Sequence, residues 1–254
     1  MGLLAALYGL VCYIVFLGSF LYAIGFVGDI GVPKGIDAGA AIDWRVALLT
    51  DMALLAAFAI QHSVMARPGF KAAWTRIVPR SVERSTYVLL SSLLLLLLFW
   101  KWQPLTAAVW DATTPAARLA LQALFGIGWL IVLLSTFMIN HFDLFGLRQV
   151  FLRLRGREYR PLSFRQRAFY HLVRHPIMLG FLIAFWATPR MSFGHLLFAL
   201  ATSGYILLGV TLEERDLVAA HGVDYQEYRS RVPMLLPTGR RRARAFEAIH
   251  NTSK

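Results

Sequence analysis

The stretch 170–180, YHLVRHPIMLG, places two histidines, an arginine, a proline and a glycine between a long arginine-rich segment and an apolar run. Pro176 disfavours helical geometry at His175 and removes a backbone donor, so we expect a helix to begin there with an exposed N-terminus. The N–H groups at the start of a helix attract anions. This stretch is therefore the first candidate for a site that binds a charged small molecule.

A pair of carboxylates, Glu213 and Glu214, ends the last apolar run, directly before Arg215. Adjacent carboxylates at the end of an apolar helix oppose membrane insertion and need partners. They have two interpretations. They form ion pairs with Arg215 or Arg229 at the water boundary, or they bind the ammonium group or the ribose hydroxyls of a ligand. Together with the basic groups of 170–180, they suit a zwitterionic ligand.

Further polar candidates lie on either side of these two groups. Tyr225, Tyr228 and Arg229 recur at about one helical turn, which predicts a short amphipathic helix that folds over the site or packs on the surface. Asp51 and His62 lie in or near an apolar run, where an ionisable side chain is a functional candidate by default. For Asp51 we favour a structural role as a hydrogen-bonding group.

The composition identifies the class of protein. Hydrophobic residues make up 57% of the 254 residues and the mean hydropathy is +0.56, more than one soluble core of this size can hide. The only cysteine, Cys12, excludes an intramolecular disulfide and a cysteine-based metal site. The net charge of +12 lies in loops between apolar runs, where membrane lipid and topology explain it better than nucleic acid does.

The fold class predicted is all-α, a polytopic transmembrane bundle in a single domain, 1–254. Six apolar runs are candidate spans, at about 4–28, 45–64, 86–102, 117–139, 177–189 and 192–212. With both termini in the cytoplasm, 21 of the 26 lysines and arginines lie on the cytoplasmic side. We expect residues 141–155 to form an amphipathic helix along the membrane surface, residues 213–237 a cytoplasmic helical segment, and 238–254 a basic tail that is disordered or contacts lipid.

Several familiar motifs are absent. HLVRH at 171–175 lacks the glutamate of the zinc-binding HExxH motif. The chain also has no glycine-rich phosphate loop and no G-x-S-x-G nucleophile elbow. The sequence therefore predicts no metal site, and the polar residues at the ends of the last helices remain as the candidate site.

The C-terminal part resembles a known group of membrane enzymes. R-H-P-x-x-x-G at 174–180, the paired glutamates, and H-G-x-x-Y-x-x-Y-x-x-x-V at 221–232 are similar to the signature of integral-membrane methyltransferases. That group includes isoprenylcysteine carboxyl methyltransferases and phospholipid N-methyltransferases. Three upstream segments, 61–71, 83–100 and 140–152, resemble the narrower NnrU-like group, and in particular the bacterial methanethiol S-methyltransferases, which make dimethyl sulfide.

The resemblance implies S-adenosylmethionine as methyl donor, a small thiol as acceptor, and the bacterial inner membrane as location. The cofactor-binding part would be about 141–237, with methionine at Met178 where tyrosine is common. Carried over residue by residue, the cofactor-binding positions are His171, His175, Pro176, Leu179, Gly180, Glu213, Glu214, Tyr225, Tyr228 and Arg229.

The implied chemistry needs little covalent machinery. Methyl transfer from a sulfonium to sulfur is an in-line displacement, so proximity and a dry site supply much of the rate. The acceptor must lose its proton, because a thiol is mostly protonated near neutral pH. His175, His62 and Arg174 are the candidates to promote this step, in that order.

Two alternatives remain open. One is a methyltransferase for a prenylcysteine or lipid-like acceptor. The other is a non-enzymatic or haem-binding NnrU-like membrane protein, in which imidazoles act as axial ligands. The histidines considered for that role are His62, His141, His171 and His175.

Overall fold

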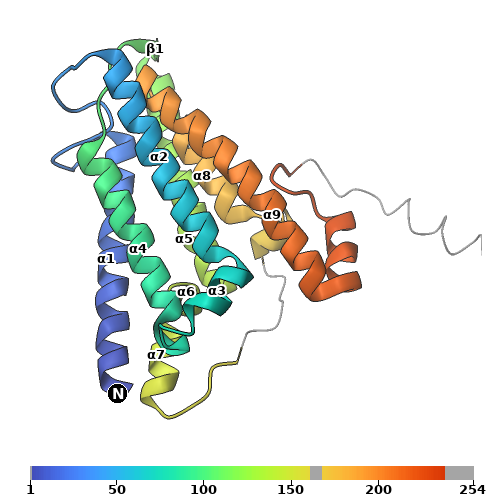
Figure 1. Ribbon diagram of the computed structural model, residues 1–254. Coiled ribbons are helices and arrows are strands. Elements are labelled where there is room, and N and C mark those ends of the chain that lie inside the picture. The colour runs from blue at the N-terminus through green and yellow to red at the C-terminus, as the bar shows by residue number, and fades with distance from the viewer. Residues whose placement is uncertain (1, 161–167, 238–254) are drawn as a thin grey trace, which may run out of the picture.

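The computed structural model describes residues 2–160 and 168–237 and shows a bundle of helices with one small sheet (Figure 1). The long helices are α1 (Gly2–Gly28), α2 (Trp44–Ala66), α4 (Arg80–Lys101), α5 (Pro115–Ile139) and α9 (Phe193–Arg231). The short ones are α3 (Pro68–Trp74), α6 (His141–Leu144), α7 (Leu147–Leu154), the 3₁₀ helix η1 (Ala168–His171) and α8 (Pro176–Trp186). Strands β1 (Ala108–Asp111) and β2 (Arg190–Ser192) pair antiparallel, with Ala108 opposite Ser192.

The chain is an integral membrane protein built from helices, as the sequence predicts. Within the described residues, five helices are long and apolar enough to cross a membrane. The fifth expected span, at about 177–189, corresponds to α8, which has 11 residues and is therefore about 16 Å long. Because the hydrocarbon core is about 30 Å thick, the six-span count stays a prediction. The basic tail 238–254 lies outside the described residues.

Side-chain caps fix three helix starts at the end of the bundle that carries the β1–β2 sheet. The Asp43 carboxylate accepts hydrogen bonds from the first turn of α2, and the Thr114 hydroxyl accepts one from the first turn of α5. Ser192 accepts one from His195 N in the first turn of α9. Each cap satisfies backbone N–H groups that a helix leaves without partners. These residues define where the chain re-enters the bundle.

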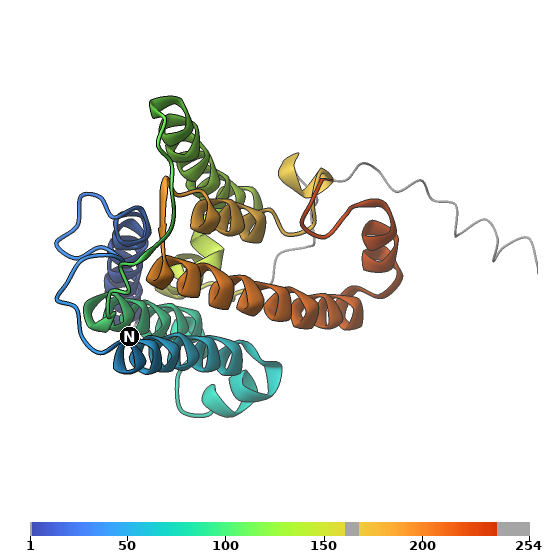
Figure 2. The same ribbon diagram turned by 90° about the horizontal axis from the view of Figure 1, so that it is seen from above.

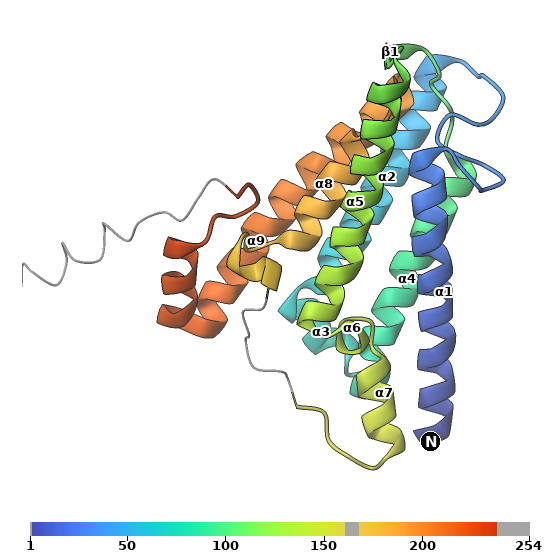
Figure 3. The ribbon, with the colours of Figure 1, turned by 180° about the vertical axis from the view of Figure 1, so that it is seen from behind.

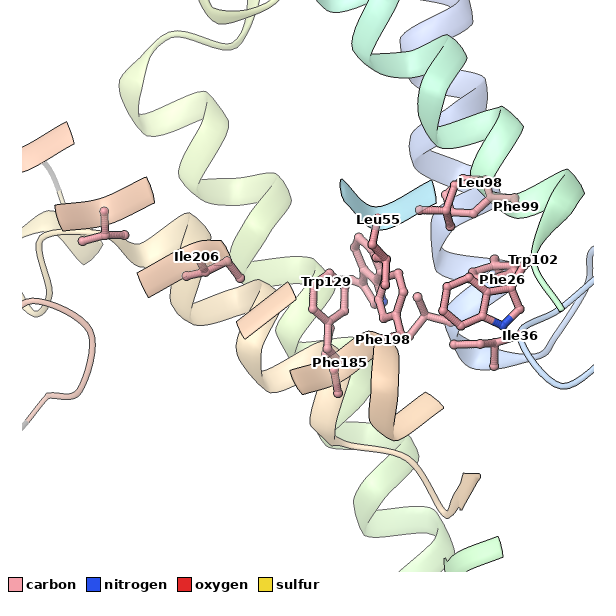
Figure 4. Packing of buried hydrophobic residues seen from close by; sticks show 14 residues of the cluster. Phe26, Ile36, Leu55, Leu98, Phe99, Trp102, Trp129, Phe185, Phe198 and Ile206 are labelled. Atoms are coloured by element: carbon pink, nitrogen blue, oxygen red, sulfur yellow. The ribbon is translucent and has the colours of Figure 1, made fainter. Parts of the chain in front are cut away.

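Aromatic packing forms the core at the same end. Figure 4 shows Phe26 of α1, Phe99 of α4, Trp102 directly after α4, and Phe198 of α9 in contact. Phe26 and Trp102 have no exposed surface, and their rings meet edge to face with centroids 5.9 Å apart. Seen from above, α9 runs between the α2–α4 pair and the α5–α8 pair (Figure 2). The sheet end of the bundle is therefore packed around the start of α9. The C-terminal end of α9 extends away from the other helices (Figure 1).

Helices α5 and α8 approach each other through two glycines, Gly128 and Gly180. A Cβ atom on Gly128 would lie 2.8 Å from the carbonyl oxygen of Gly180, and one on Gly180 would lie 2.7 Å from that of Gly128. Small residues allow this close backbone contact between membrane helices, where packing replaces the hydrophobic effect. Gly180, a predicted cofactor-binding position, thus has a packing role that accounts for glycine there.

Residues Leu147–Leu154 form the main helix expected within 141–155, and part of its apolar face packs on α1. Val150 of α7 is fully buried, and its side chain fills the space beside Gly9 of α1, where a Cβ atom would lie 2.6 Å from Val150 Cγ2. Phe151, on the other side of α7, stays exposed.

We predict that Gly128→Leu lowers the free energy of unfolding in detergent by about 1–3 kcal/mol, because overpacking must separate α5 from α8. Gly126→Leu is the matched control, since nothing lies within 4 Å of a Cβ atom at that position of the same helix. Thermal unfolding of the two purified variants measures the difference. Equal melting temperatures would contradict the tight α5–α8 contact.

Candidate functional site

The buried carboxylate of Glu214, on α9, is the centre of a charged cluster. Its Oε1 atom lies 2.6 Å from Arg174 Nε and 3.2 Å from His175 Nε2. Its Oε2 atom lies 3.3 Å from Arg229 Nε. Glu214 is only 5% exposed, so each of these charge-assisted contacts acts in a medium of low dielectric. The structure therefore brings together four of the residues that the sequence predicts for the site, which we call the Glu214 cluster.

A kink in α9 makes this cluster possible. Gly222 has φ 56° and ψ −127°, a backbone conformation that residues with a Cβ atom rarely adopt. Beyond it the helix turns back beside its own end (Figure 3). The returning segment buries Tyr225 and Tyr228, whose ring centroids are 5.8 Å apart. The short helix that the spacing of Tyr225, Tyr228 and Arg229 predicts is confirmed, and it folds back against the Glu214 cluster.

Arg174 ties the returning segment to the stretch before α8. Besides Glu214, its guanidinium donates to the carbonyl oxygens of Arg229 at 2.9 Å and Val232 at 2.5 Å. The backbone amide of Arg174 donates to Pro233 O and that of His175 to Met234 O. The expected exposed helix N-terminus is therefore wrong, because His175 and Pro176 are buried and residues 233–234 pair with the backbone at the cap.

The water-accessible rim of the cluster carries one negative and one positive side chain. The Glu213 and Arg229 side chains are about half exposed, and Glu213 Oε2 lies 3.6 Å from His175 Nδ1. Tyr170 lies nearby, and its carbonyl oxygen accepts a 2.7 Å hydrogen bond from the Tyr228 hydroxyl. Burial, reinforced by the Glu213 carboxylate, raises the pKa of the Tyr170 phenol, which therefore remains a hydrogen-bond donor. A carboxylate and a guanidinium facing the same water boundary suit a zwitterionic ligand.

The remaining predicted cofactor positions lie around this cluster rather than in it. His171 is exposed at the end of η1, and Leu179 is half-buried in the first turn of α8. Met178, at the position where tyrosine is common in the resembling family, packs against the hydrophobic core. Met178 thus lies on the side of α8 that faces the core. The charged groups of the site come from the stretch before α8 and from α9 with its returning segment.

His62 lies in a separate hydrogen-bonded group between α2 and α4. Its Nε2 atom is 2.9 Å from the Tyr87 hydroxyl and its Nδ1 atom 3.3 Å from Ser91 Oγ. Asp51, also on α2, is fully buried and accepts a 2.9 Å hydrogen bond from Gln103 N, as expected for a structural role. The structure thus separates two predicted polar residues of one helix into different environments.

Hydrogen bonds at two of the histidines argue against haem ligation. Both ring nitrogens of His62 face hydroxyl groups, and those of His141 lie 2.8 Å from the Tyr13 and Thr136 hydroxyls. His175 faces the two glutamates. In residues 2–160 and 168–237, no group of three or more His, Cys, Asp or Glu side chains could hold a metal ion.

Two cavities lie away from the Glu214 cluster. One, of about 450 Å³, is lined by residues of the α5–α7 connection, including Asn140, Phe142 and Arg148. The other, of about 350 Å³, lies at the sheet end beside His195 and the loop that follows α1. None of the residues that line them belongs to the Glu214 cluster.

Some contacts of the candidate site were missed by the sequence analysis. The carbonyl oxygens of Val232, Pro233 and Met234 carry no side-chain signal, so only the fold reveals them. Tyr87 and Ser91 did leave a signal, since they stand four residues apart in a leucine-rich run, on one face of a helix.

Comparison with known proteins settles the family. A sequence model described as NnrU protein matches residues 52–233, from α2 to the returning segment. The chain belongs to the NnrU family. The matched range includes both the Glu214 cluster and the group around His62.

Relatives of the chain are similar along most of its length. A methanethiol S-methyltransferase of Mycobacterium tuberculosis is 57% identical over 234 residues, which cover 92% of this chain and 96% of the relative. Methanethiol S-methyltransferase 2 of Bradyrhizobium diazoefficiens is 57% identical over 231 residues, 91% of this chain and 89% of the relative. Nurim of Mus musculus is 31% identical over 206 residues, 74% of this chain and 78% of the relative. A search of solved structures finds no match.

We predict that Glu214→Gln lowers the free energy of unfolding by about 3–5 kcal/mol, because it leaves the buried Arg174 guanidinium without its counter-charge. The adjacent Glu213→Gln is the control, with an expected change within about 0.5 kcal/mol for a half-exposed side chain. Thermal unfolding in detergent compares them. Similar losses in both variants would show that the Glu214 ion pairs do not hold the returning segment.

Proposed function

We propose that the protein transfers a methyl group from S-adenosylmethionine to methanethiol and so produces dimethyl sulfide. The observation that carries this proposal is the 57% identity, over 96% of its length, to a relative named methanethiol S-methyltransferase. Such similarity across nearly the whole chain supports a shared reaction rather than a shared fold alone.

The residues present fit S-adenosylmethionine. Its amino-acid part carries an ammonium and a carboxylate, which match the half-exposed Glu213 and Arg229 side chains. When bound, it supplies a methyl group activated by a sulfonium. The proposed binding residues are His171, His175, Pro176, Leu179, Gly180, Glu213, Glu214, Tyr225, Tyr228 and Arg229. Within this set the Glu214 cluster orients Arg229 and His175, and the returning segment limits access of water.

The three candidates for thiol deprotonation differ in their surroundings. Arg174 is held by Glu214 and by two carbonyl oxygens, so in our proposal it positions the returning segment. His175 lies between two carboxylates and would face the donor. His62 is bonded to uncharged hydroxyl groups only, in the apolar part of the bundle. That environment suits contact with an apolar thiol, which partitions into lipid.

The proposed location is the bacterial inner membrane, with both termini in the cytoplasm and α8 as the fifth of six spans. This orientation places 21 of the 26 lysines and arginines on the cytoplasmic side. It also places the Glu214 cluster at the cytoplasmic boundary, where a soluble, charged donor is available. The thiol would then enter sideways from the bilayer.

We expect the purified, detergent-solubilised protein to form dimethyl sulfide from S-adenosylmethionine and methanethiol, as measured by headspace gas chromatography. Parallel reactions with a prenylcysteine and a lipid amine test larger acceptors, and boiled protein is the control. Methylation of the larger acceptors alone would overturn the proposed substrate. Absence of all products, together with absence of cofactor binding, would overturn the enzymatic function.

We further predict that Arg229→Gln weakens binding of S-adenosylmethionine by about 10- to 100-fold, the loss expected for one hydrogen bond to a charged group. Arg231→Gln is the matched control, because Arg231 is 60% exposed and its nearest carboxylate, Glu227, is 3.9 Å away. Equilibrium dialysis with labelled cofactor measures both affinities. An equal effect of the two substitutions would assign Arg229 to long-range electrostatics instead of direct contact.

A further inference from the structure

Two histidines, the half-buried His62 and the buried His141, share one bonding pattern in this protein. His62 bridges the hydroxyls of Tyr87 and Ser91, and His141 bridges those of Tyr13 and Thr136. In both, Nε2 faces the tyrosine and Nδ1 faces the shorter hydroxyl. The proposed donor site uses neither pair, so each could serve another purpose.

The hydrogen bonds around His62 determine where its proton lies. Ser91 Oγ donates its only proton to Gln61 Oε1 at 3.2 Å, while the Gln61 amide nitrogen faces Met65 Sδ. Ser91 Oγ must therefore accept from His62, which places the ring proton on Nδ1. Nε2 is then the atom with a free lone pair, and it accepts from Tyr87.

The Tyr87 hydroxyl in turn directs its proton toward His62. It lies 2.9 Å from Nε2 and 3.4 Å from the His62 carbonyl oxygen, and both of these atoms can only accept. The lone pairs of the Tyr87 oxygen are consequently available to a proton donor from the substrate. A thiol S–H group is such a donor.

Location distinguishes His62 from His141. Helix α2 contacts α9 through Ser63 and Tyr205, 3.1 Å apart, and through Arg67 and Asp216, 3.1 Å apart. From Tyr205 to Glu214 is about 14 Å along α9, so the group around His62 lies deeper in the bundle than the Glu214 cluster. His141 instead packs on α1 and stacks on Phe137 of α5, with ring centroids 4.3 Å apart.

We infer that Tyr87 and His62 form the site that deprotonates the acceptor thiol, an inference that rests on the proposed function. The thiol gives its S–H proton to Tyr87 Oη as Tyr87 passes its own proton to His62 Nε2. The acceptor sulfur forms a bond to the donor's methyl carbon, and the bond from that carbon to the sulfonium sulfur breaks. Tyr87 ends unchanged, and His62 returns the proton to water after the products leave. Ser91 and Gln61 are positioning residues that keep Nε2 unprotonated beforehand.

Two thiols of similar size and different acidity test this inference. Ethanethiol is almost wholly protonated at neutral pH, whereas 2,2,2-trifluoroethanethiol is substantially ionised without help. We expect Tyr87→Phe and His62→Gln to lower the ethanethiol rate by about 100-fold or more, the usual contribution of a general base. The trifluoroethanethiol rate should fall less than tenfold, and the ethanethiol rate of Tyr87→Phe should recover as the pH rises. Ser91→Ala should have a smaller effect, and it should likewise lower the ethanethiol rate more than the trifluoroethanethiol rate.

Tyr13→Phe and His141→Gln are the matched controls, since they alter the same chemical groups in the other pair. They should change the two rates by one common factor. If the Tyr87 and His62 variants lose the same fraction of their methylation rate with both thiols, or lose all activity with both, the inference is overturned and the two residues have a structural role. The same selectivity in the His141 pair would overturn it as well. If wild-type protein methylates neither these thiols nor methanethiol, the proposed function itself fails.

Discussion

The buried carboxylate of Glu214 imposes the constraint on which the polar end of this protein depends. Removing a carboxylate from water costs several kcal/mol unless charged partners with good geometry surround it. Those partners, Arg174, His175 and Arg229, come from two segments that are far apart in the chain. The stretch before α8 and the segment after Gly222 must therefore meet at the end of α9. The ion pairs and the fold of the C-terminal region thus require each other.

The rest of the bundle supplies a rigid support for that meeting point. Aromatic rings and side-chain caps pack the start of α9 at the sheet end, and the contact between Gly128 and Gly180 holds α8 against α5. Since α8 begins at Pro176, the position of its backbone also sets the positions of Arg174 and His175. Helix packing in the apolar region therefore determines the geometry of charges at its boundary.

This division into an apolar interior and a charged boundary matches the two reactants of the proposed reaction. The methyl donor is a charged, water-soluble molecule, and the half-exposed charges beside Glu214 face water. The acceptor is a small apolar thiol, and the Tyr87–His62 pair lies deeper in the bundle, where His62 stacks on Phe58. A membrane enzyme that joins such reactants needs little covalent chemistry, because orientation and exclusion of water supply much of the rate.

The sequence by itself determined the membrane class, the helix ranges to within a few residues in most cases, and the residues of the Glu214 cluster. Hydropathy and side-chain chemistry are local properties, so a single chain displays them. Only the tertiary structure decided that the start of α8 is covered, that α7 packs on α1, and that His62 bonds to Tyr87 and Ser91. Those results depend on the partners of backbone carbonyls, on close approach at glycines, and on which faces of distant helices meet. None of these is encoded by residue type or spacing alone.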